Sequence, residues 1–151
     1  MQNIRFKKLE WKFKETNFQY DSINKPSKQI SEAQDIWNLF YPYFHELAVE
    51  NFVVILLGTT NRIQGFDIVS SGSLNSTIVT PREIFRSAIA ANCANIILTH
   101  NHPSGDCEPS NEDIQITKKL IECGKILDIQ IFDHIVFGNK LYCSMQERRL
   151  I

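Results

Sequence analysis

Two kinds of hydrophobic periodicity follow each other along the chain and predict a mixture of helices and strands. Apolar residues recur every three or four positions in residues 31–47, 80–89 and 110–124, which is typical of amphipathic helices. Short runs of consecutive or alternating apolar residues predict strands at 51–58, 62–70, 94–99, 126–132, 135–137 and 141–144. Because helices and strands do not alternate strictly, we expect an α/β fold in which helices sandwich a mixed β-sheet.

The first helix is expected to begin at Ser31. Ser31 and Gln34 have the spacing of a capping box, in which side chains bond the free N–H groups of the first turn. Pro42 lies inside the apolar pattern and is expected to kink this helix or split it in two, because proline cannot donate a backbone hydrogen bond.

The other two helices have recognisable ends. Thr80 as N-cap, Pro81 at the first helical position and Glu83 closing a capping box predict the start of the second helix. Ser110 is expected to open the third helix and Gly124 to close it. The buried stripe of the second helix is expected to comprise Ile84, Phe85, Ala88 and Ile89.

Residues 51–58 (NFVVILLG) predict a central strand, because a strand covered on both faces is apolar at nearly every position. The turn-forming residues 58–61 then join it to residues 62–70 as a hairpin.

The first 30 residues differ from the rest in charge. They hold 7 Lys or Arg against 3 Asp or Glu, a net charge of +4. Leu9, Trp11 and Phe13 alternate with charged residues, which predicts a half-buried edge strand guarded by lysines. A basic, aromatic surface for nucleic acid is the alternative interpretation. We therefore divide the chain into a basic N-terminal strand and connector at 1–30 and a globular domain at 31–151.

Composition narrows the class of protein. The 151 residues are 43% hydrophobic and carry a net charge of −1, which fits one ordinary domain and not a strongly basic nucleic-acid binder. No apolar run is long enough to span a membrane, and no export signal is recognisable at the start. The four cysteines form no Cys-x-x-Cys pair and are expected to be reduced thiols. A cytoplasmic protein is the expectation.

One stretch concentrates candidate chemistry. His100 and His102 lie two residues apart at the end of a predicted strand, so both side chains can point to one side. Asp113 follows at the start of a helix, and two imidazoles with one carboxylate are ligands of a kind that hold catalytic zinc. The alternative is that Ser110 and Asp113 are only an N-cap and a first-turn acid.

The spacing in this stretch is that of a known motif. The pattern His-x-His, seven residues, Ser, two residues, Asp resembles the JAMM motif of MPN-type (JAB-type) metalloproteases. Its positions are occupied by His100, His102, Ser110 and Asp113. Residues 100–106, 80–85 and 133–136 are similar to the bacterial RadC-like branch, so the resemblance covers roughly residues 45–145. It implies the MPN architecture, which is related to that of cytidine deaminases.

The resemblance also implies a role for each residue. His100, His102 and Asp113 would bind one Zn²⁺ ion per chain, and Ser110 would hydrogen-bond the oxyanion of the intermediate. The family needs an upstream glutamate as general base. Glu50 takes that role here because it immediately precedes the predicted central strand, as the family's glutamate does. A plain acid at a helix end is the alternative interpretation of Glu50.

Several other residues near the motif are expected to be structural. Glu46 is expected to be solvated, Asp106 to cap the turn at 104–107 and Cys107 to be a loop thiol. His134 is expected to be structural, with support of the metal ligands as the alternative, and His45 to lie on the surface.

The implied activity is hydrolysis of a peptide, isopeptide or similar amide bond of a peptide or protein substrate by a zinc-activated water and a Glu general base. A non-catalytic MPN scaffold, or a DNA-associated protein linked to repair, is the alternative. A zinc deaminase is disfavoured because His-x-Glu and Pro-Cys-x-x-Cys are both missing. The oligomeric state is left open.

Overall fold

The computed structural model describes residues 8–17, 29–72 and 79–151. Its helices and strands, in chain order, are α1 (Ala33–Phe44), β1 (Asn51–Leu57), β2 (Ile63–Ser71), α2 (Pro81–Ala90), β3 (Asn95–Asn101), α3 (Asn111–Leu127), β4 (Gln130–Phe137) and β5 (Tyr142–Ser144). No helix of this described part is long and apolar enough to cross a membrane.

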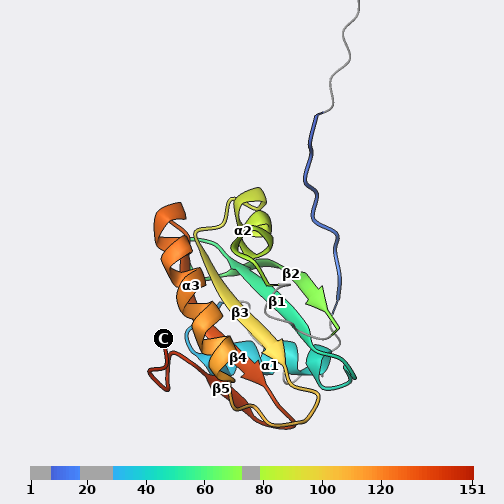
Figure 1. Cartoon of the computed structure of the whole chain (residues 1–151). Coiled ribbons are helices and arrows are strands. Elements are labelled where there is room, and N and C mark those ends of the chain that lie inside the picture. Colours follow the sequence, from blue (N-terminus) through green and yellow to red (C-terminus); the bar gives the residue numbers. More distant parts are fainter. Residues whose placement is uncertain (1–7, 18–28, 73–78) are drawn as a thin grey trace, which may run out of the picture.

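The five strands form one mixed sheet in the order β2-β1-β3-β4-β5 (Figure 1). β3 and β4 are parallel, joined by the crossover helix α3, and the other neighbouring pairs are antiparallel. β1 and β2 form the expected hairpin. The fold is therefore the α/β class that the sequence predicted, a mixed sheet flanked by helices.

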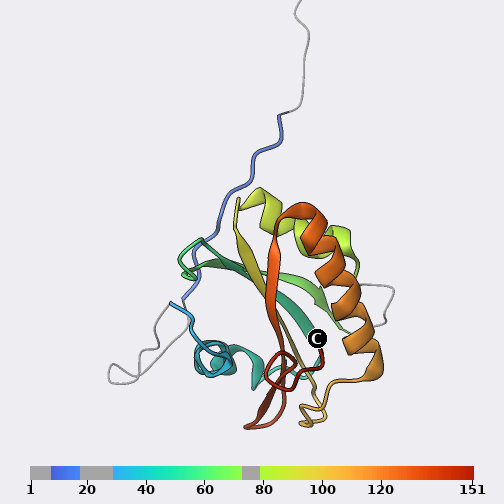
Figure 2. The same cartoon turned by 90° about the vertical axis from the view of Figure 1, so that its left-hand side faces the viewer.

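Helices cover both faces of the sheet. α1 packs on one face, and α2 and α3 pack on the other (Figure 2). All seven residues of β1 are buried, and successive side chains enter opposite cores: Phe52, Val54 and Leu56 face α2 and α3, while Val53, Ile55 and Leu57 face α1. This confirms β1 as a central strand covered on both sides.

The start of α1 differs from the prediction by a shift of the cap. The N-cap is Glu32 rather than Ser31, and the bonding side chain is Asp35 rather than Gln34. One carboxylate oxygen of Asp35 accepts hydrogen bonds from the N–H and hydroxyl of Ser31 and from the N–H of Glu32. Pro42 does not split the helix, because it lies in the last turn and α1 ends two residues later.

Two details of α2 and α3 also differ. Thr80 caps α2 as predicted, but the Glu83 carboxylate pairs with Arg86 at 3.0 Å instead of completing a capping box. Ile89 is 59% exposed and does not belong to the buried stripe. α3 continues past Gly124 to Leu127, and Asp128 ends it in the left-handed conformation (φ 53°). Gly124 is needed inside the helix because a Cβ there would lie 2.5 Å from the carbonyl oxygen of Ile129.

The predicted strands at 126–132 and 135–137 are wrong as two elements. Ile126 and Leu127 belong to α3, and a single strand, β4, runs through the polar pair Asp133 and His134. The polar pair stays in the strand because Asp133 is bonded: its carboxylate accepts from the Ser144 hydroxyl and from the N–H groups of His134 and Gln146.

The predicted N-terminal edge strand is not present in its described part. Residues 8–17 form no strand and extend outward from beside β2 (Figure 1). The three alternating apolar side chains are more than half exposed: Leu9 76%, Trp11 54% and Phe13 64%. The Phe13 ring lies against Gly65 of β2, where a Cβ would come within 2.9 Å of it. The remaining positions of that prediction, at 1–7 and 18–28, lie outside the described residues.

Asp35→Ala should lower the free energy of unfolding by about 1 kcal/mol at neutral pH, because it removes the acceptor of three N-terminal donors of α1. Although burial opposes the charge, hydrogen bonds from Ser31 and Glu32 hold the pKa of Asp35 below its ordinary value. A lowered folded-state pKa stabilises above the unfolded pKa, and that contribution is lost as pH falls through the folded value.

Urea unfolding of the parent and Asp35→Ala at neutral and strongly acidic pH measures both effects. Gln34→Ala is the control, since it removes only a surface hydrogen bond to Asn38 in the same helix. A difference between parent and Asp35→Ala that grows as pH falls would contradict this account of the cap.

Candidate metal centre

Three side chains from two elements meet at one end of the sheet. His100 is the penultimate residue of β3, His102 follows the end of that strand, and Asp113 lies in the first turn of α3. One potential ligand atom from each lies within 4.8 Å of the other two. Among the described residues, this is the cluster of His, Cys, Asp and Glu side chains with the geometry to hold a metal ion.

The separations match the edges of a zinc tetrahedron. The Nε2 atoms of His100 and His102 are 3.0 Å apart, and the Asp113 Oδ2 atom lies 3.5 Å from the first and 3.7 Å from the second. Ligand atoms about 2.0–2.1 Å from a tetrahedral ion lie roughly 3.3 Å from one another. The three atoms therefore fit a shared zinc ion as three of its four ligands.

The orientation of His102 is set by the loop that follows it. Its Nδ1 atom lies 2.9 Å from the carbonyl oxygen of Asp106, and a carbonyl can only accept. Nδ1 therefore carries the proton, and Nε2 of the neutral ring presents a lone pair to Asp113 and His100. A lone pair beside a carboxylate oxygen requires a shared cation, which is either a proton or a metal ion.

The pKa shifts of His102 and Asp113 also indicate that the cluster favours a positive charge. The Asp113 carboxylate raises the pKa of His102 above its ordinary value, and the charge of Glu50 adds to that effect. Although burial opposes ionisation, the neighbouring rings of His100 and His102 and the cap bond from Ser110 hold the pKa of Asp113 well below its usual range. The site therefore keeps its carboxylate ionised and attracts a cation.

The cap of α3 places Asp113. The Asp113 Oδ2 atom accepts from the N–H of Ser110 at 2.8 Å, while the Ser110 hydroxyl accepts from the N–H of Asp113 at 3.1 Å. Asp113 can therefore be a helix-capping acid and a candidate metal ligand at the same time, because the capping box that starts α3 also aims its carboxylate at the histidines. Ser110 itself is exposed, and its hydroxyl proton is not used by the cap bond.

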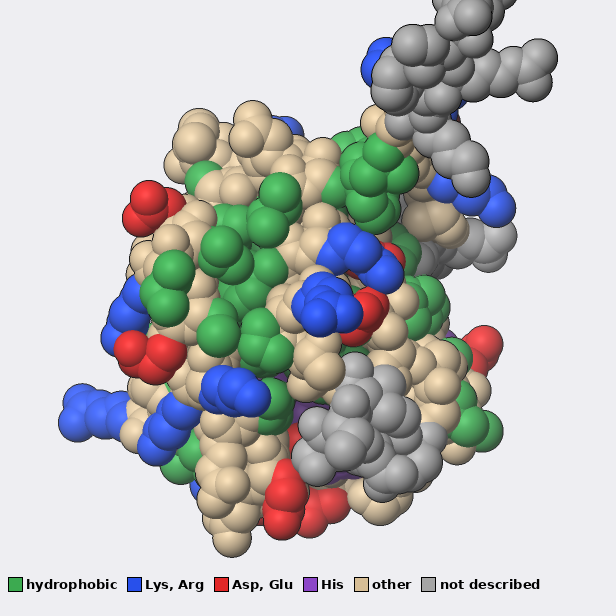
Figure 3. Space-filling view, turned by 45° about the horizontal axis from the view of Figure 1, so that its top comes forward, with side chains coloured by type: hydrophobic (Ala, Val, Ile, Leu, Met, Phe, Trp, Pro, Cys, Tyr) green, Lys and Arg blue, Asp and Glu red, His purple; other side chains and the backbone are tan. Residues whose placement is uncertain are grey.

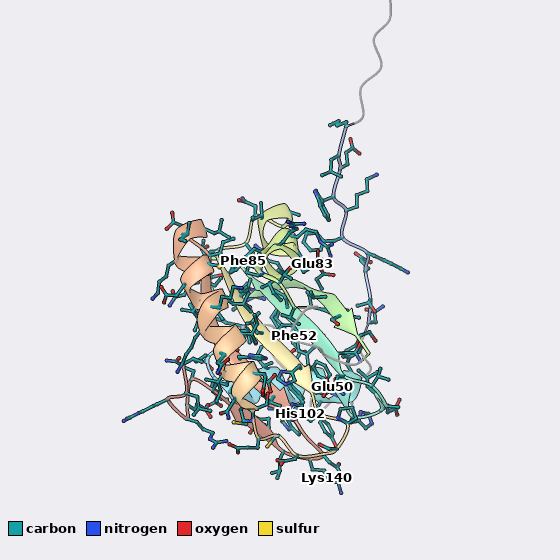
Figure 4. The ribbon with its side chains drawn as sticks, in the orientation of Figure 1. Glu50, Phe52, Glu83, Phe85, His102 and Lys140 are labelled. Carbon is teal, nitrogen blue, oxygen red and sulfur yellow. The ribbon has the colours of Figure 1, made fainter. Side chains whose placement is uncertain are left out.

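Glu50 lies close to His102 (Figure 4). It is half-buried immediately before β1, and its backbone carbonyl accepts from the N–H of Gly72 at 2.8 Å. Figure 4 shows Glu50 beside His102, in agreement with its effect on the pKa of that ring. Figure 3 shows that histidine side chains reach the surface, with acidic side chains nearby.

Three other residues near the motif or on α1 have contacts that fit the structural roles expected of them. The Asp106 carboxylate accepts from the N–H of Glu108, which makes it a turn cap. Cys107 packs against an apolar cluster that includes Val136, Cys143 and Met145. His45 is exposed at the end of α1, stacked on Tyr41, and lies outside the cluster.

A group of contacts lies behind His100; the sequence offered His134 as a possible support of the metal ligands, but not Thr117. The Nδ1 atom of His100 lies 2.8 Å from Nε2 of His134, whose Nδ1 atom lies 2.6 Å from the hydroxyl of Thr117. Burial lowers the pKa of His134 well below its usual value, so this ring is neutral. Phe52 stacks parallel to the His100 ring at 5.9 Å. The available signal was the position of Thr117, four residues after Asp113 on the same helical face.

A second loop holds the His102 loop in place. The N–H of His102 donates to the carbonyl of Phe137, and the N–H of Asn139 donates to the carbonyl of Gly105. Gly105 has a φ of 89°, which side chains disfavour. At Gly138 the loops approach so closely that a Cβ would lie 2.4 Å from the Gly105 carbonyl oxygen. The carbonyl that fixes His102 therefore depends on this contact.

A family match and individual relatives both connect this chain with one group of proteins. The family described as "RadC-like JAB domain" matches residues 30–150. The chain is 48% identical over 130 residues to a UPF0758 protein of Clostridium beijerinckii, covering 86% of this chain and 56% of that protein. It is 47% identical over 126 residues to one of Methanococcoides burtonii, covering 83% and 55%. The chain thus spans about half the length of these curated relatives.

Gly138→Ala should lower the free energy of unfolding by about 1–3 kcal/mol, because the new Cβ must push the His102 loop away from β4. Gly58→Ala is the matched control: a Cβ there meets only the end of the flexible Gln64 side chain, at 3.0 Å. Urea unfolding compares the two variants with the parent. Equal stabilities for both variants would contradict a tight contact between the loops.

Proposed function

The chain belongs to the RadC-like JAB domain family, and from that premise we propose that it is a zinc-dependent hydrolase of peptide or isopeptide-like amide bonds. His100, His102 and Asp113 would hold one zinc ion. The observation that carries the proposal is the convergence of their three acceptor atoms at 3.0, 3.5 and 3.7 Å, the separations that a tetrahedral zinc ion needs.

The donor set suits catalysis better than a purely structural site. Structural zinc sites close all four positions with protein ligands, whereas catalytic sites keep one position open. The described residues supply three ligand atoms to this cluster. When bound at such a site, zinc acts as a Lewis acid that makes hydroxide available near neutral pH and polarises a carbonyl group.

Glu50 and Ser110 would then move the protons and stabilise charge. The Glu50 carboxylate accepts a proton from the attacking water and passes it to the leaving amine, which completes the cleavage of the amide bond. The Ser110 hydroxyl, whose oxygen already accepts from the N–H of Asp113, donates its proton in a hydrogen bond to the oxyanion.

His102→Ala should abolish zinc retention, because it removes one of the three proposed ligands. Protein purified without chelators should contain about one zinc ion per chain by elemental analysis. His45→Ala is the control, since that histidine is exposed and lies outside the cluster. A folded parent that takes up no zinc even when zinc is supplied would contradict the proposal and favour a non-catalytic scaffold.

Glu50→Gln should keep zinc and lower the rate of amide hydrolysis by about 10²–10⁴-fold, because glutamine cannot accept the proton. The assay uses a panel of fluorogenic peptides and lysine-isopeptide substrates on the zinc-loaded protein. Glu46→Gln is the matched control: Glu46 is exposed and lies beside His45. Hydrolysis by Glu50→Gln as fast as by the parent would show that the base is a different residue.

A further inference from the structure

We infer that Thr117 and His134 are positioning residues that fix the tautomer of His100 and thereby make its Nε2 atom the metal ligand. The inference rests on the metal site proposed above. It is carried by a chain of buried hydrogen bonds that links the hydroxyl of Thr117, the ring of His134 and the ring of His100. All three side chains are 0% exposed, so water cannot replace a member of the chain.

The first link fixes the position of one proton. The Thr117 Oγ1 atom lies 2.6 Å from the backbone carbonyl oxygen of Asp113, four residues earlier in α3. A carbonyl oxygen cannot donate, and two oxygens at this distance repel unless a proton lies between them. The single proton of the Thr117 hydroxyl therefore points at that carbonyl.

The second link follows from the first. The Nδ1 atom of His134 lies 2.6 Å from the same hydroxyl oxygen, whose proton is already used. His134 must therefore donate from Nδ1 to Thr117. Its neutral ring then has a lone pair at Nε2, and that lone pair is directed at Nδ1 of His100 over 2.8 Å.

The third link determines what His100 presents to the site. Its Nδ1 atom donates to His134, so Nε2 carries the lone pair and faces Nε2 of His102 and Oδ2 of Asp113. In the reverse arrangement the Thr117 hydroxyl would donate to Nδ1 of His134. His134 would then carry its hydrogen on Nε2 and donate to Nδ1 of His100. Nε2 of His100 would then carry hydrogen and could not bind a metal ion.

The two histidine ligands are therefore oriented by different means. The backbone carbonyl of Asp106 fixes His102, whereas two buried side chains fix His100. Thr117 also ties the chain to the helix that carries Asp113, because it bonds the backbone of that ligand. A change at Thr117 should therefore act on His100 without removing any metal ligand.

The direct test is the tautomer of His100 in the metal-free parent, measured by ¹⁵N chemical shifts and long-range ¹H–¹⁵N couplings at alkaline pH. We expect His100 and His134 to carry hydrogen on Nδ1 and no hydrogen on Nε2. Hydrogen on Nε2 of His100 would overturn the inference. Because zinc is not needed, this result stands apart from the proposed function: a parent that binds no zinc would defeat that function and leave the tautomer measurable.

The second test compares three variants by zinc competition titration. Thr117→Val removes the hydroxyl at nearly constant volume and should weaken zinc binding by about 10–100-fold. Thr117→Ser keeps the hydroxyl and should restore affinity to near the parental value. Thr99→Val is the matched control: Thr99 is also fully buried and precedes His100, but its hydroxyl lies 3.4 Å from the Val53 carbonyl and outside the chain of bonds.

A purely structural role for Thr117 predicts a different result. Thr117→Val would then lose stability in thermal unfolding, while its zinc affinity and the His100 tautomer stayed equal to those of Thr99→Val. That outcome would overturn the inference. If Thr117→Val fails to fold, the ¹⁵N measurement on the parent decides the question alone.

Discussion

The point where two imidazole nitrogens and one carboxylate oxygen meet is the constraint on which the rest of the site depends. Acceptor atoms 3.0–3.7 Å apart repel unless a cation lies between them, so other contacts must hold them there. The strand β3, buried between β1 and β4, fixes His100, and the capping box at the start of α3 fixes Asp113. The loop after His102 is held by the β4–β5 turn. Each proposed ligand thus belongs to a rigid element or is bonded to one.

The polar interior around this point is fully paired. Among the described residues, no buried side-chain nitrogen or oxygen lacks a hydrogen-bond partner. Because an unpaired polar group in a core is costly, the buried histidines and Thr117 are held in one arrangement rather than several. The neighbour of His134 in β4 also links parts of the fold: the Asp133 carboxylate accepts hydrogen bonds from the N–H of His134, from Ser144 of β5 and from Gln146 after β5. The same strand therefore supports the proposed ligand His100 and the C-terminal turn.

Sequence patterns predicted much of this arrangement and failed for identifiable reasons. The apolar run of β1, the N-cap at Ser110 and the spacing of His100, His102 and Asp113 are local signals, and the structure confirms the strand, the cap and the closeness of the three ligand atoms. The division of β4 was wrong because a polar Asp133 inside a strand is explained only by its distant partner Ser144. The edge strand expected at Leu9, Trp11 and Phe13 is missing in the described part, since periodicity alone does not supply a neighbouring strand. The spacing of Thr117 from Asp113 places it on the same helical face, but its contact with His134 of β4 joins elements far apart in the sequence, which no local pattern shows.

The claim that these side chains form one metal site is tested most directly by anomalous diffraction at the zinc absorption edge from crystals of the zinc-loaded chain. The account predicts a single strong peak about 2 Å from Nε2 of His100, Nε2 of His102 and the Asp113 carboxylate. A peak bound through Nδ1 of either histidine, or zinc located only at other residues while this cluster stays empty, would contradict it.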